Sequence, residues 1–291
     1  MIFYLKYFIL IREWLKESQN DIPEYINENI YYLGQAYSLI WQSVRQNTLF
    51  NGNYETDNTD FDNYLKRLGY KFKNENFEVG GYAILKNKNC ILAMDVGNSP
   101  QKRFSHNYQS GALSFEFFYK DKKLISNSGY FQDYKNKLNL ISKSTAAHSA
   151  LIIDNHSSCS FRNNGKYKIL ENGLKISDKN IVNEKNYWLI KASHNGFLKK
   201  FGILCERSLE YFVEKNKLIG TDKIITKNKS FLIRGSGVDV NYYKRKKEIK
   251  KIDLKKTIKI FFPSRIMKEK GIIELLEACQ SLIDDNVKLY L

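Results

Sequence analysis

The sequence is poor in proline, in cysteine and in long apolar runs. It holds three Pro and four Cys among 291 residues, which excludes collagen-like chains and small disulfide scaffolds. The cysteines, Cys90, Cys159, Cys205 and Cys279, form no CxxC pair, so we predict buried free thiols rather than a zinc ribbon. No apolar run reaches the roughly 18–20 residues that a membrane helix needs. We therefore expect no membrane span.

Arginine is also scarce, although the chain is strongly basic. It carries 47 basic and 31 acidic side chains, a net charge of +16, and Lys supplies most of the positive charge. Lys, Asn, Ile, Tyr and Phe share A/T-rich codons, so coding bias explains this balance. Base recognition usually uses the planar fork of Arg, so we predict no nucleic-acid partner. A hydrophobic content of 43% is ample for a packed core.

The first 15 residues are apolar but do not read as a signal peptide. Lys6, Arg12 and Glu13 interrupt them, and no small-residue cleavage site follows. We expect an amphipathic helix here, and the localisation stays open.

The pattern then predicts helices followed by strands. Apolar positions recur at helical spacing to about residue 48, with Asp21 as the expected cap of a helix that has Pro23 in its first turn. Another short helix is expected at 60–68. From about residue 77, short β segments favour a mainly β fold, an antiparallel β-sandwich. The expected strands lie in a hairpin over 80–95 and at 112–119, 123–127, 149–153, 187–193, 203–209 and 211–213.

A second change of pattern comes near Ser230. A strand at 258–263, a helix at 271–283 and a strand at 287–291 predict the start of a parallel, Rossmann-like α/β unit. We therefore divide the chain into a helical segment (1–74), a β-sandwich (75–229) and a partial α/β segment (230–291).

Several stretches resemble the C-terminal β-sandwich domain of the heparinase II/III-like polysaccharide lyases. The likeness covers about residues 20 to 225. It rests on 108–116 (YQSGALSFE), 125–130 (ISNSGY), 142–154 (SKSTAAHSALIID), 192–197 (ASHNGF), 205–207 (CER) and the junction 49–53 (LFNGN).

This resemblance implies β-elimination at a uronic acid, with an acidic polysaccharide as partner. In the family, a Tyr or His removes the C5 proton while other groups neutralise the sugar carboxylate. The cleft lies between an N-terminal α/α toroid and the sandwich, and most of the catalytic residues come from the toroid. The helical segment resembles only the end of that toroid, so we expect no activity from this chain alone, and its status as an enzyme stays open.

The same resemblance nominates His148 and His106 as catalytic candidates, and Arg207, Lys143 and Gln109 as substrate-binding candidates. His148 is equally well read as a buried histidine between strands, and His106 as a loop residue without a role. Arg207 and Lys143 are also consistent with ordinary strand-face charges. We expect His194 to lie in a turn and His156 to be exposed.

Some family members hold zinc in the sandwich through His and Asp. In this sequence Gln109 stands where a His is expected, and Asn127 stands where the acid is expected. Amides are weak zinc ligands. We therefore predict no metal and no cofactor.

The tail resembles the start of the nucleotide-sugar-binding domain of family 4 glycosyltransferases, which have the GT-B fold. Residues 235–239 (GSGVD) resemble the family's Gly-Val-Asp loop, and 264–271 (SRIMKEKG) with 274–278 (ELLEA) resemble its Arg…Lys-Gly segment. The resemblance implies that Arg265 and Lys270, with Gly235 and Gly237, bind a nucleotide sugar. The resemblance breaks off at the second strand of that domain, so glycosyl transfer is not expected from this chain alone.

Three hypotheses follow: a lyase-family sandwich that acts on or binds acidic polysaccharide, a fragment of a cell-surface polysaccharide glycosyltransferase, and a carbohydrate-binding module without catalysis. The abrupt change near Ser230 also raises the hypothesis that two neighbouring genes were joined by deletion or misassembly.

Overall fold

The computed structural model describes residues 2–42, 48–54, 58–73, 76–120, 122–226, 230–234, 238–239, 259–261 and 288–290. The chain forms two compact units, Met1–Asn241 and Tyr242–Leu291. Within the described ranges, no helix combines the length and the apolar character needed to cross a membrane.

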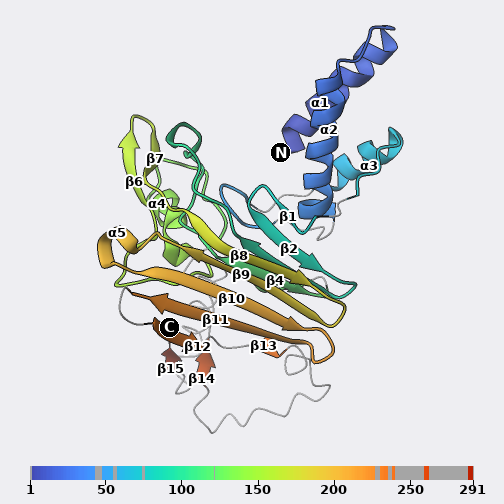
Figure 1. Ribbon diagram of the computed structural model, residues 1–291. Coiled ribbons are helices and arrows are strands. Elements are labelled where there is room, and N and C mark those ends of the chain that lie inside the picture. Colours follow the sequence, from blue (N-terminus) through green and yellow to red (C-terminus); the bar gives the residue numbers. More distant parts are fainter. Residues whose placement is uncertain are drawn as a thin grey trace. The chain divides into compact units, whose positions relative to one another are not determined.

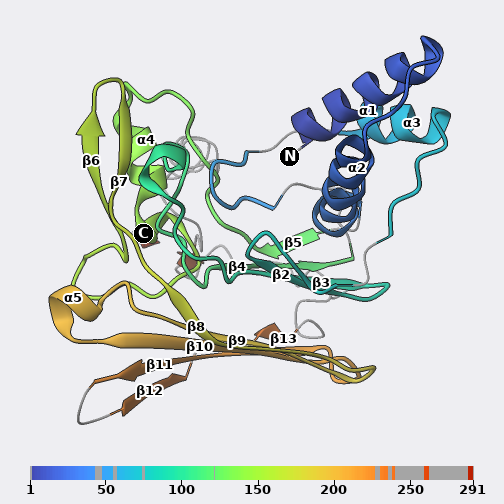
Figure 2. The same cartoon turned by 45° about the horizontal axis from the view of Figure 1, so that its top comes forward.

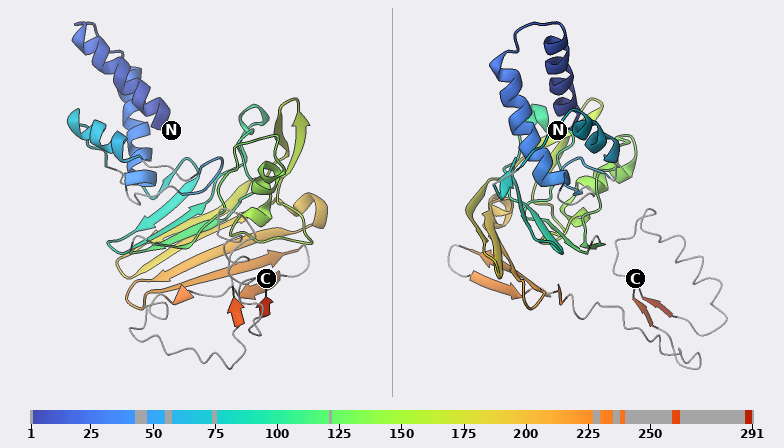
Figure 3. Two further views of the ribbon diagram at one scale, coloured as in Figure 1. Left: turned by 180° about the vertical axis from the view of Figure 1, so that it is seen from behind. Right: turned by 90° about the vertical axis from the view of Figure 1, so that its right-hand side faces the viewer.

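The first unit begins with helices. These are α1 (Ile2–Glu17), α2 (Glu24–Tyr37), a π-helical turn η1 (Ser38–Gln42) that continues α2, and α3 (Thr59–Arg67). Helices α1 and α2 lie side by side (Figures 1 and 3). Their facing apolar stripes, including Leu5, Ile9, Ile26 and Ile30, form a small core of their own.

The start of α2 differs from the expectation. The helix begins at Glu24, and Pro23 occupies the position before it with an extended ψ of 138° and no side-chain capping bond. The extended backbone at Pro23 leaves Asp21 outside the first turn. The prediction that Asp21 caps this helix is therefore wrong.

Two antiparallel sheets follow, as the sequence predicts. The first has the order β1-β2-β3-β4-β5, and the second has the order β12-β11-β10-β9-β8 with β13 paired to β11. Figure 2 shows them as two layers. The strands of the first sheet are β1 (Glu78–Val79), β2 (Tyr82–Lys86), β3 (Cys90–Asp95), β4 (Phe115–Tyr119) and β5 (Lys122–Ile125). Those of the second are β8 (Ile176–Asn183), β9 (Tyr187–His194), β10 (Leu204–Phe212), β11 (Lys217–Ile225), β12 (Ser230–Arg234) and β13 (Val238–Asp239).

The main core lies between these sheets. Burial alternates along β10, so one face of the strand points inward. From this face Leu209 and Tyr211 meet Leu92 and Phe117 of the first sheet in one apolar cluster. Each such buried side chain stabilises the fold by about 1.5–3 kcal/mol. Three free cysteines, Cys90, Cys159 and Cys205, are buried as predicted, and Cys279 lies outside the described residues.

Smaller elements lie in the connections within and between the two sheets. They are η2 (Lys102–Phe104), α4 (Lys137–Lys143), η3 (Thr145–Ala147), the hairpin β6 (Ser160–Asn164) and β7 (Tyr167–Asn172), and α5 (Leu198–Phe201). Helix α4 starts where the side chain of Asn136 accepts a hydrogen bond from the Leu138 amide.

One predicted strand is absent and one is longer than expected. Residues 149–153 form only a bridge between Ile153 and His156, because the hydroxyl of Ser149, not a backbone ladder, bonds the backbone of Phe115. The prediction of a strand there is wrong. The expected strands at 203–209 and 211–213 are one continuous strand, β10.

The tail is described only in part. Strands β14 (Lys259–Phe261) and β15 (Lys288–Tyr290) lie within the two predicted tail strands and pair in parallel. The predicted helix between them lies outside the described residues, as do Gly235, Gly237, Arg265 and Lys270.

Candidate functional site

The segment that joins the helices to the sandwich is fixed by hydrogen bonds. The Leu49 amide donates to Glu116 Oε2 (3.2 Å), and the Asn51 side chain donates to Tyr82 (3.0 Å) and to Asp95 Oδ2 (2.8 Å). Glu116 and Asp95 are both buried. Burial raises the pKa of Glu116, and it raises the pKa of Asp95 to about 7.

A glycine is required in this segment. Gly52 has a φ of +83°, and a Cβ atom on it would lie 2.7 Å from the Cβ of Asn107. Only glycine permits both this backbone conformation and this close approach. The junction and the loop that carries His106 are therefore in direct contact.

The side chain of Gln109 connects three backbone segments by hydrogen bonds beneath the same loop. Its Oε1 accepts from the Gly52 amide (2.9 Å), and its Nε2 donates to the carbonyls of Gly129 (3.0 Å) and Ser142 (2.6 Å). The side chain is fully buried. Every one of these bonds is internal to the protein.

The amides at the expected zinc position do not fit zinc. Both polar atoms of the Gln109 side chain already make the hydrogen bonds given above. Asn127 Oδ1 accepts a hydrogen bond from the Ser149 amide (2.9 Å). Neither group offers the imidazole or carboxylate that zinc prefers. Across the described ranges, no three His, Cys, Asp or Glu residues converge as a ligand set.

Arg207 lies within the sandwich, and its guanidinium makes four hydrogen bonds. Its Nε and Nη2 donate to the two carboxylate oxygens of Asp222, both at 2.7 Å, in a bidentate pair. Its Nη1 donates to the carbonyls of Leu113 (2.9 Å) and Ser149. The guanidinium therefore ties β10 and β11 to the loops above β4.

Lys143 is also buried, with only 1% of its surface exposed. Its ammonium donates to the carbonyls of His106 and Tyr108 (3.0 Å to Tyr108) and lies over the rings of Tyr130 and Phe161, at 5.4 Å and 4.9 Å. Burial, and then the nearby charge of Lys168, lowers its pKa to about 8. Lys143 supports the His106 loop from below.

The histidines divide into buried and exposed pairs. His148 is 3% exposed and packs beneath Gly111, where an added Cβ would come 3.2 Å from the imidazole Cγ. His194 ends β9, and its Nδ1 accepts from the Gly196 amide (3.1 Å). Burial, and then the charge of Arg207, lowers the pKa of His194 to about 4, so this imidazole is neutral at pH 7. His106 and His156 reach the surface.

Above this buried layer lies a group that we call the tyrosine–lysine surface, in which three residues are exposed and two are half-buried: His106, Lys166 and Tyr167, with Tyr130 and Tyr134. The ring of Tyr167 lies 5.8 Å from that of His106 and 5.4 Å from that of Tyr134. The ammonium of Lys166 lies 4.9 Å above the Tyr134 ring. A hydrogen bond in which the Lys166 ammonium donates to the Tyr134 side chain raises the pKa of Lys166 above its ordinary value, so this lysine is charged at pH 7. Aromatic faces and a cation thus share one patch.

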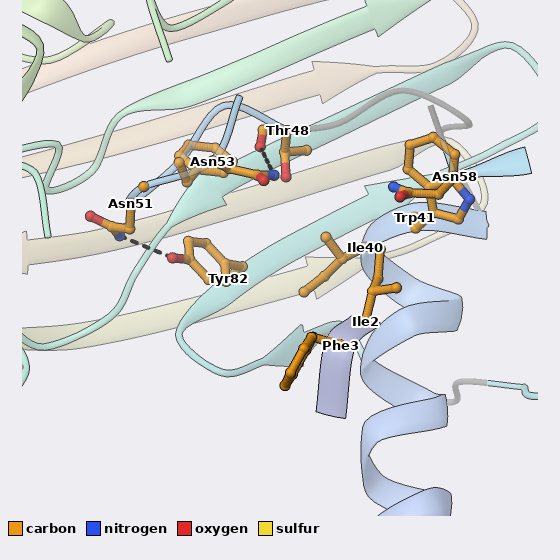
Figure 4. A pocket seen from close by; sticks show the side chains of 11 residues that line it. Ile2, Phe3, Ile40, Trp41, Thr48, Asn51, Asn53, Asn58 and Tyr82 are labelled. Carbon is orange, nitrogen blue, oxygen red and sulfur yellow. Dashed lines mark hydrogen bonds between the residues drawn. The ribbon is translucent and has the colours of Figure 1, made fainter. Parts of the chain in front are cut away.

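A pocket of about 460 Å³ adjoins the junction segment, within the size range of ligand sites. Figure 4 shows Phe3 and Ile40 on the side of the helices and Asn51, Asn53 and Tyr82 on the side of the sandwich. Asn53 also connects the pocket to the tyrosine–lysine surface, because its carbonyl accepts from the Tyr130 amide (2.9 Å).

The sequence motifs nominate only part of this arrangement. Of the nominated residues, His106 reaches the surface, whereas His148, Arg207, Lys143 and Gln109 are buried. Tyr134, Lys166 and Tyr167 were not nominated. Lys166 and Tyr167 carry one sequence signal, the basic, aromatic hairpin tip Lys166-Tyr167-Lys168, to which Tyr134 does not belong.

Comparisons with known proteins agree with the fold. The family model "Heparinase II/III-like, C-terminal" matches residues 71–241. No curated protein matches the sequence significantly. Among solved structures, the heparan sulfate lyase HepC from Pedobacter heparinus is similar with a TM-score of 0.59 and 16% identity, over 77% of this chain and 37% of that one.

Two further structures show the same fold. The heparinase III BT4657 gene product has a TM-score of 0.54 and 14% identity, over 70% of this chain and 33% of that one. Another heparinase III structure has a TM-score of 0.51 and 16% identity, over 76% of this chain and 39% of that one. The chain thus spans between 33% and 39% of the length of these structures. Because the family model covers more than half of it, the chain belongs to the heparinase II/III-like family and contains its C-terminal domain.

Proposed function

We propose that this chain is the sandwich-bearing part of a polysaccharide lyase, and that its tyrosine–lysine surface binds an acidic, uronate-containing polysaccharide. The observation that carries the proposal is the meeting of Tyr134, Tyr167 and Lys166 beside His106. Flat aromatic faces suit the apolar C–H face of a sugar ring, and a fixed ammonium suits its carboxylate. Family membership supports the reaction class.

The proposed reaction is β-elimination. A base takes the C5 proton of the uronate, the C5–H electron pair forms the C4=C5 double bond, and the C4–O bond breaks as the leaving oxygen takes a proton. We assign His106 as the candidate base because it is the nominated histidine that reaches the surface. Lys166 would neutralise the carboxylate as charge develops.

We propose a different role for the candidate site residues that are buried. The bonds of Lys143, Gln109 and Arg207 to the His106 loop and its neighbours make them candidate positioning residues rather than substrate contacts. His148, packed beneath Gly111, is proposed to support the same loops.

The first test is binding and cleavage with the chain as it stands. Heparan sulfate and other uronate polymers would be titrated by calorimetry, and the absorbance of unsaturated uronate would be followed. We expect binding without cleavage, because the chain spans only 37% of the similar HepC structure. Lys166→Ala should weaken binding about fivefold, whereas the control Lys185→Ala, an exposed lysine of the β8–β9 turn, should not. Absence of binding to every uronate polymer would refute the proposal, and cleavage abolished by His106→Ala would show that the chain is active alone.

For the tail we propose the beginning of a nucleotide-sugar-binding unit, and the parallel pair β14–β15 favours it. Arg265 and Lys270, with Gly235 and Gly237, are its proposed diphosphate contacts. Titration with UDP-glucose should give little or no heat if the unit is incomplete, and tight binding would contradict that view. Resequencing the gene across the codons for residues 220–240 tests the hypothesis of two joined genes.

A further inference from the structure

A second cavity lies at the other end of the β6–β7 hairpin. It has a volume of about 590 Å³ and is lined by the loop before β6, by the base of the hairpin and by α5 with the turn before it. Figures 1 and 2 show α5 near the foot of this hairpin. The cavity is separate from the junction pocket, and the two share no lining residue.

The charged side chains that line this cavity are both positive. Lys199 and Lys200 are its charged lining residues, His156 is its titratable ring, and no Asp or Glu lines it. The ammonium of Lys199 donates a hydrogen bond to Oδ1 of Asn172 (3.4 Å), another lining residue. The carboxylate of Asp154 lies just outside the lining, 3.8 Å from His156 Nδ1. An anionic ligand is therefore the charge-matched occupant.

The remaining walls are aromatic and hydroxyl-rich. The rings of His156 and Phe201 meet edge to face at 5.4 Å, and serine and asparagine side chains are also part of the lining. A Cβ on Gly196 would lie 2.6 Å from the Ser158 carbonyl, so only glycine allows the backbone to approach so closely here. An aromatic wall beside several short polar groups matches the mixed surface of a sugar.

We propose that this cavity is an auxiliary site for one unit of an acidic saccharide, distinct from the tyrosine–lysine surface. The hairpin links the two sites, because Tyr167 at its tip belongs to that surface and Asn172 at its base lines the cavity. Five residue steps separate them, about 17 Å along an extended strand. One polymer can then engage both sites, and its avidity exceeds that of either site alone. This linkage rests on the proposed function, whereas the cavity's own affinity does not.

The test uses the full chain and a heparin-derived hexasaccharide. We expect Lys199→Ala/Lys200→Ala to weaken its binding by about fivefold or more in calorimetry, and a matched control, Lys185→Ala/Lys217→Ala, to leave binding unchanged. Hydrogen exchange should show that ligand protects 155–160 and 196–201 in the wild type and not in the cavity variant. Sulfate ion and maltohexaose should each bind more weakly than the hexasaccharide.

Each outcome decides a separate question. Equal affinity in the cavity variant and the wild type, with no protection of these segments, would overturn the auxiliary site. Sulfate binding as tightly as the hexasaccharide would also overturn it, by showing a simple anion site. Protection at the cavity without any effect of Lys166→Ala would instead leave the auxiliary site standing and refute the proposed function at the tyrosine–lysine surface.

Discussion

The layer beneath the sandwich loops and the surface above it differ in how their polar groups are used. In the buried layer, the polar side chains hydrogen-bond to other groups of the protein; they belong to Arg207, Gln109 and Lys143. Above, Tyr167 and Lys166 are exposed and contact mainly other rings. The buried layer carries most of the family-like motif residues, and the surface carries few. The family-like motifs of this sequence thus mark the buried layer more than the exposed surface above it.

The largest effect on stability is expected when Arg207, the buried cation that pairs with a carboxylate, is removed. Arg207→Met would leave the Asp222 carboxylate and the carbonyl of Leu113 without their donor. Removing one partner of a buried pair costs about 3–5 kcal/mol. We expect a loss of that size in the free energy of unfolding, measured with urea.

Two companions show whether burial is the cause. The pair Lys191–Glu206, 3.1 Å apart and more exposed, should lose less than about 1 kcal/mol in Lys191→Ala. The double variant Arg207→Met/Asp222→Leu should recover part of the loss, because no charge is left unpaired. Equal losses at the buried and the exposed pair would contradict the distinction between the two regions.

The buried titratable groups should give opposite dependences on pH. The pKa of His194 is lowered to about 4 in the folded protein, against 6.5 as its ordinary value. The stability that its neutral form contributes is present above pH 6.5 and is lost as the pH falls toward 4. We expect the unfolding free energy of the wild type minus that of His194→Gln to fall by about 3 kcal/mol between pH 7 and pH 4.

The contribution of Asp95 to stability should change with pH in the opposite direction. Its pKa is raised from 3.8 to about 7, so its protonated form stabilises the fold at low pH, and that contribution is lost as the pH rises through 7. The stability difference between the wild type and Asp95→Asn should therefore fall as the pH rises. Differences that do not change with pH would show that neither group is desolvated as the structure indicates.

A smaller loss is expected at Gln109. Gln109→Ala removes the acceptor of the Gly52 amide and the donor to two carbonyls, and unsatisfied buried groups cost about 1–3 kcal/mol. We expect a loss of about 2–3 kcal/mol in unfolding free energy and faster hydrogen exchange in residues 48–54. Unchanged exchange in that segment would show that Gln109 does not hold the junction.

The sequence predicts the strands of the sandwich best where buried and less buried residues alternate clearly; β11 lies inside the second sheet, but its mostly half-buried residues show little alternation, and no strand is predicted there. Strand β9 was expected at 187–193 and spans Tyr187–His194, because one face of it lies in the core and alternates. Strand β8 was missed, since its polar run from Ser177 to Asn180 lies at the edge of the sheet and is exposed. Edge strands carry little hydrophobic pattern, and their pairing depends on the neighbouring strand.

The candidate site was predictable only in its motif part. The stretch around His106 and Gln109 resembles a family sequence, so those positions could be nominated. Tyr134 and Tyr167 are far apart in the chain, and only the β6–β7 hairpin brings the ring of Tyr167 within 5.4 Å of that of Tyr134. Sequence periodicity reports which face of an element is buried, and it carries no information on which exposed side chains of different loops meet.

The smallest effect on stability, and the clearest one on binding, is expected at Tyr167. This ring is 46% exposed and contacts His106 and Tyr134, so Tyr167→Ala should change the unfolding free energy by no more than about 1 kcal/mol. If the ring is a platform for saccharide, affinity for the heparin-derived hexasaccharide should fall about tenfold. Tyr25→Ala, which removes a similarly exposed ring from α2, is the matched control. An equal change of affinity in both variants would contradict a role of Tyr167 in binding. A loss of unfolding free energy in Tyr167→Ala as large as that in Gln109→Ala would show that Tyr167 supports the fold, and the two regions would then not differ.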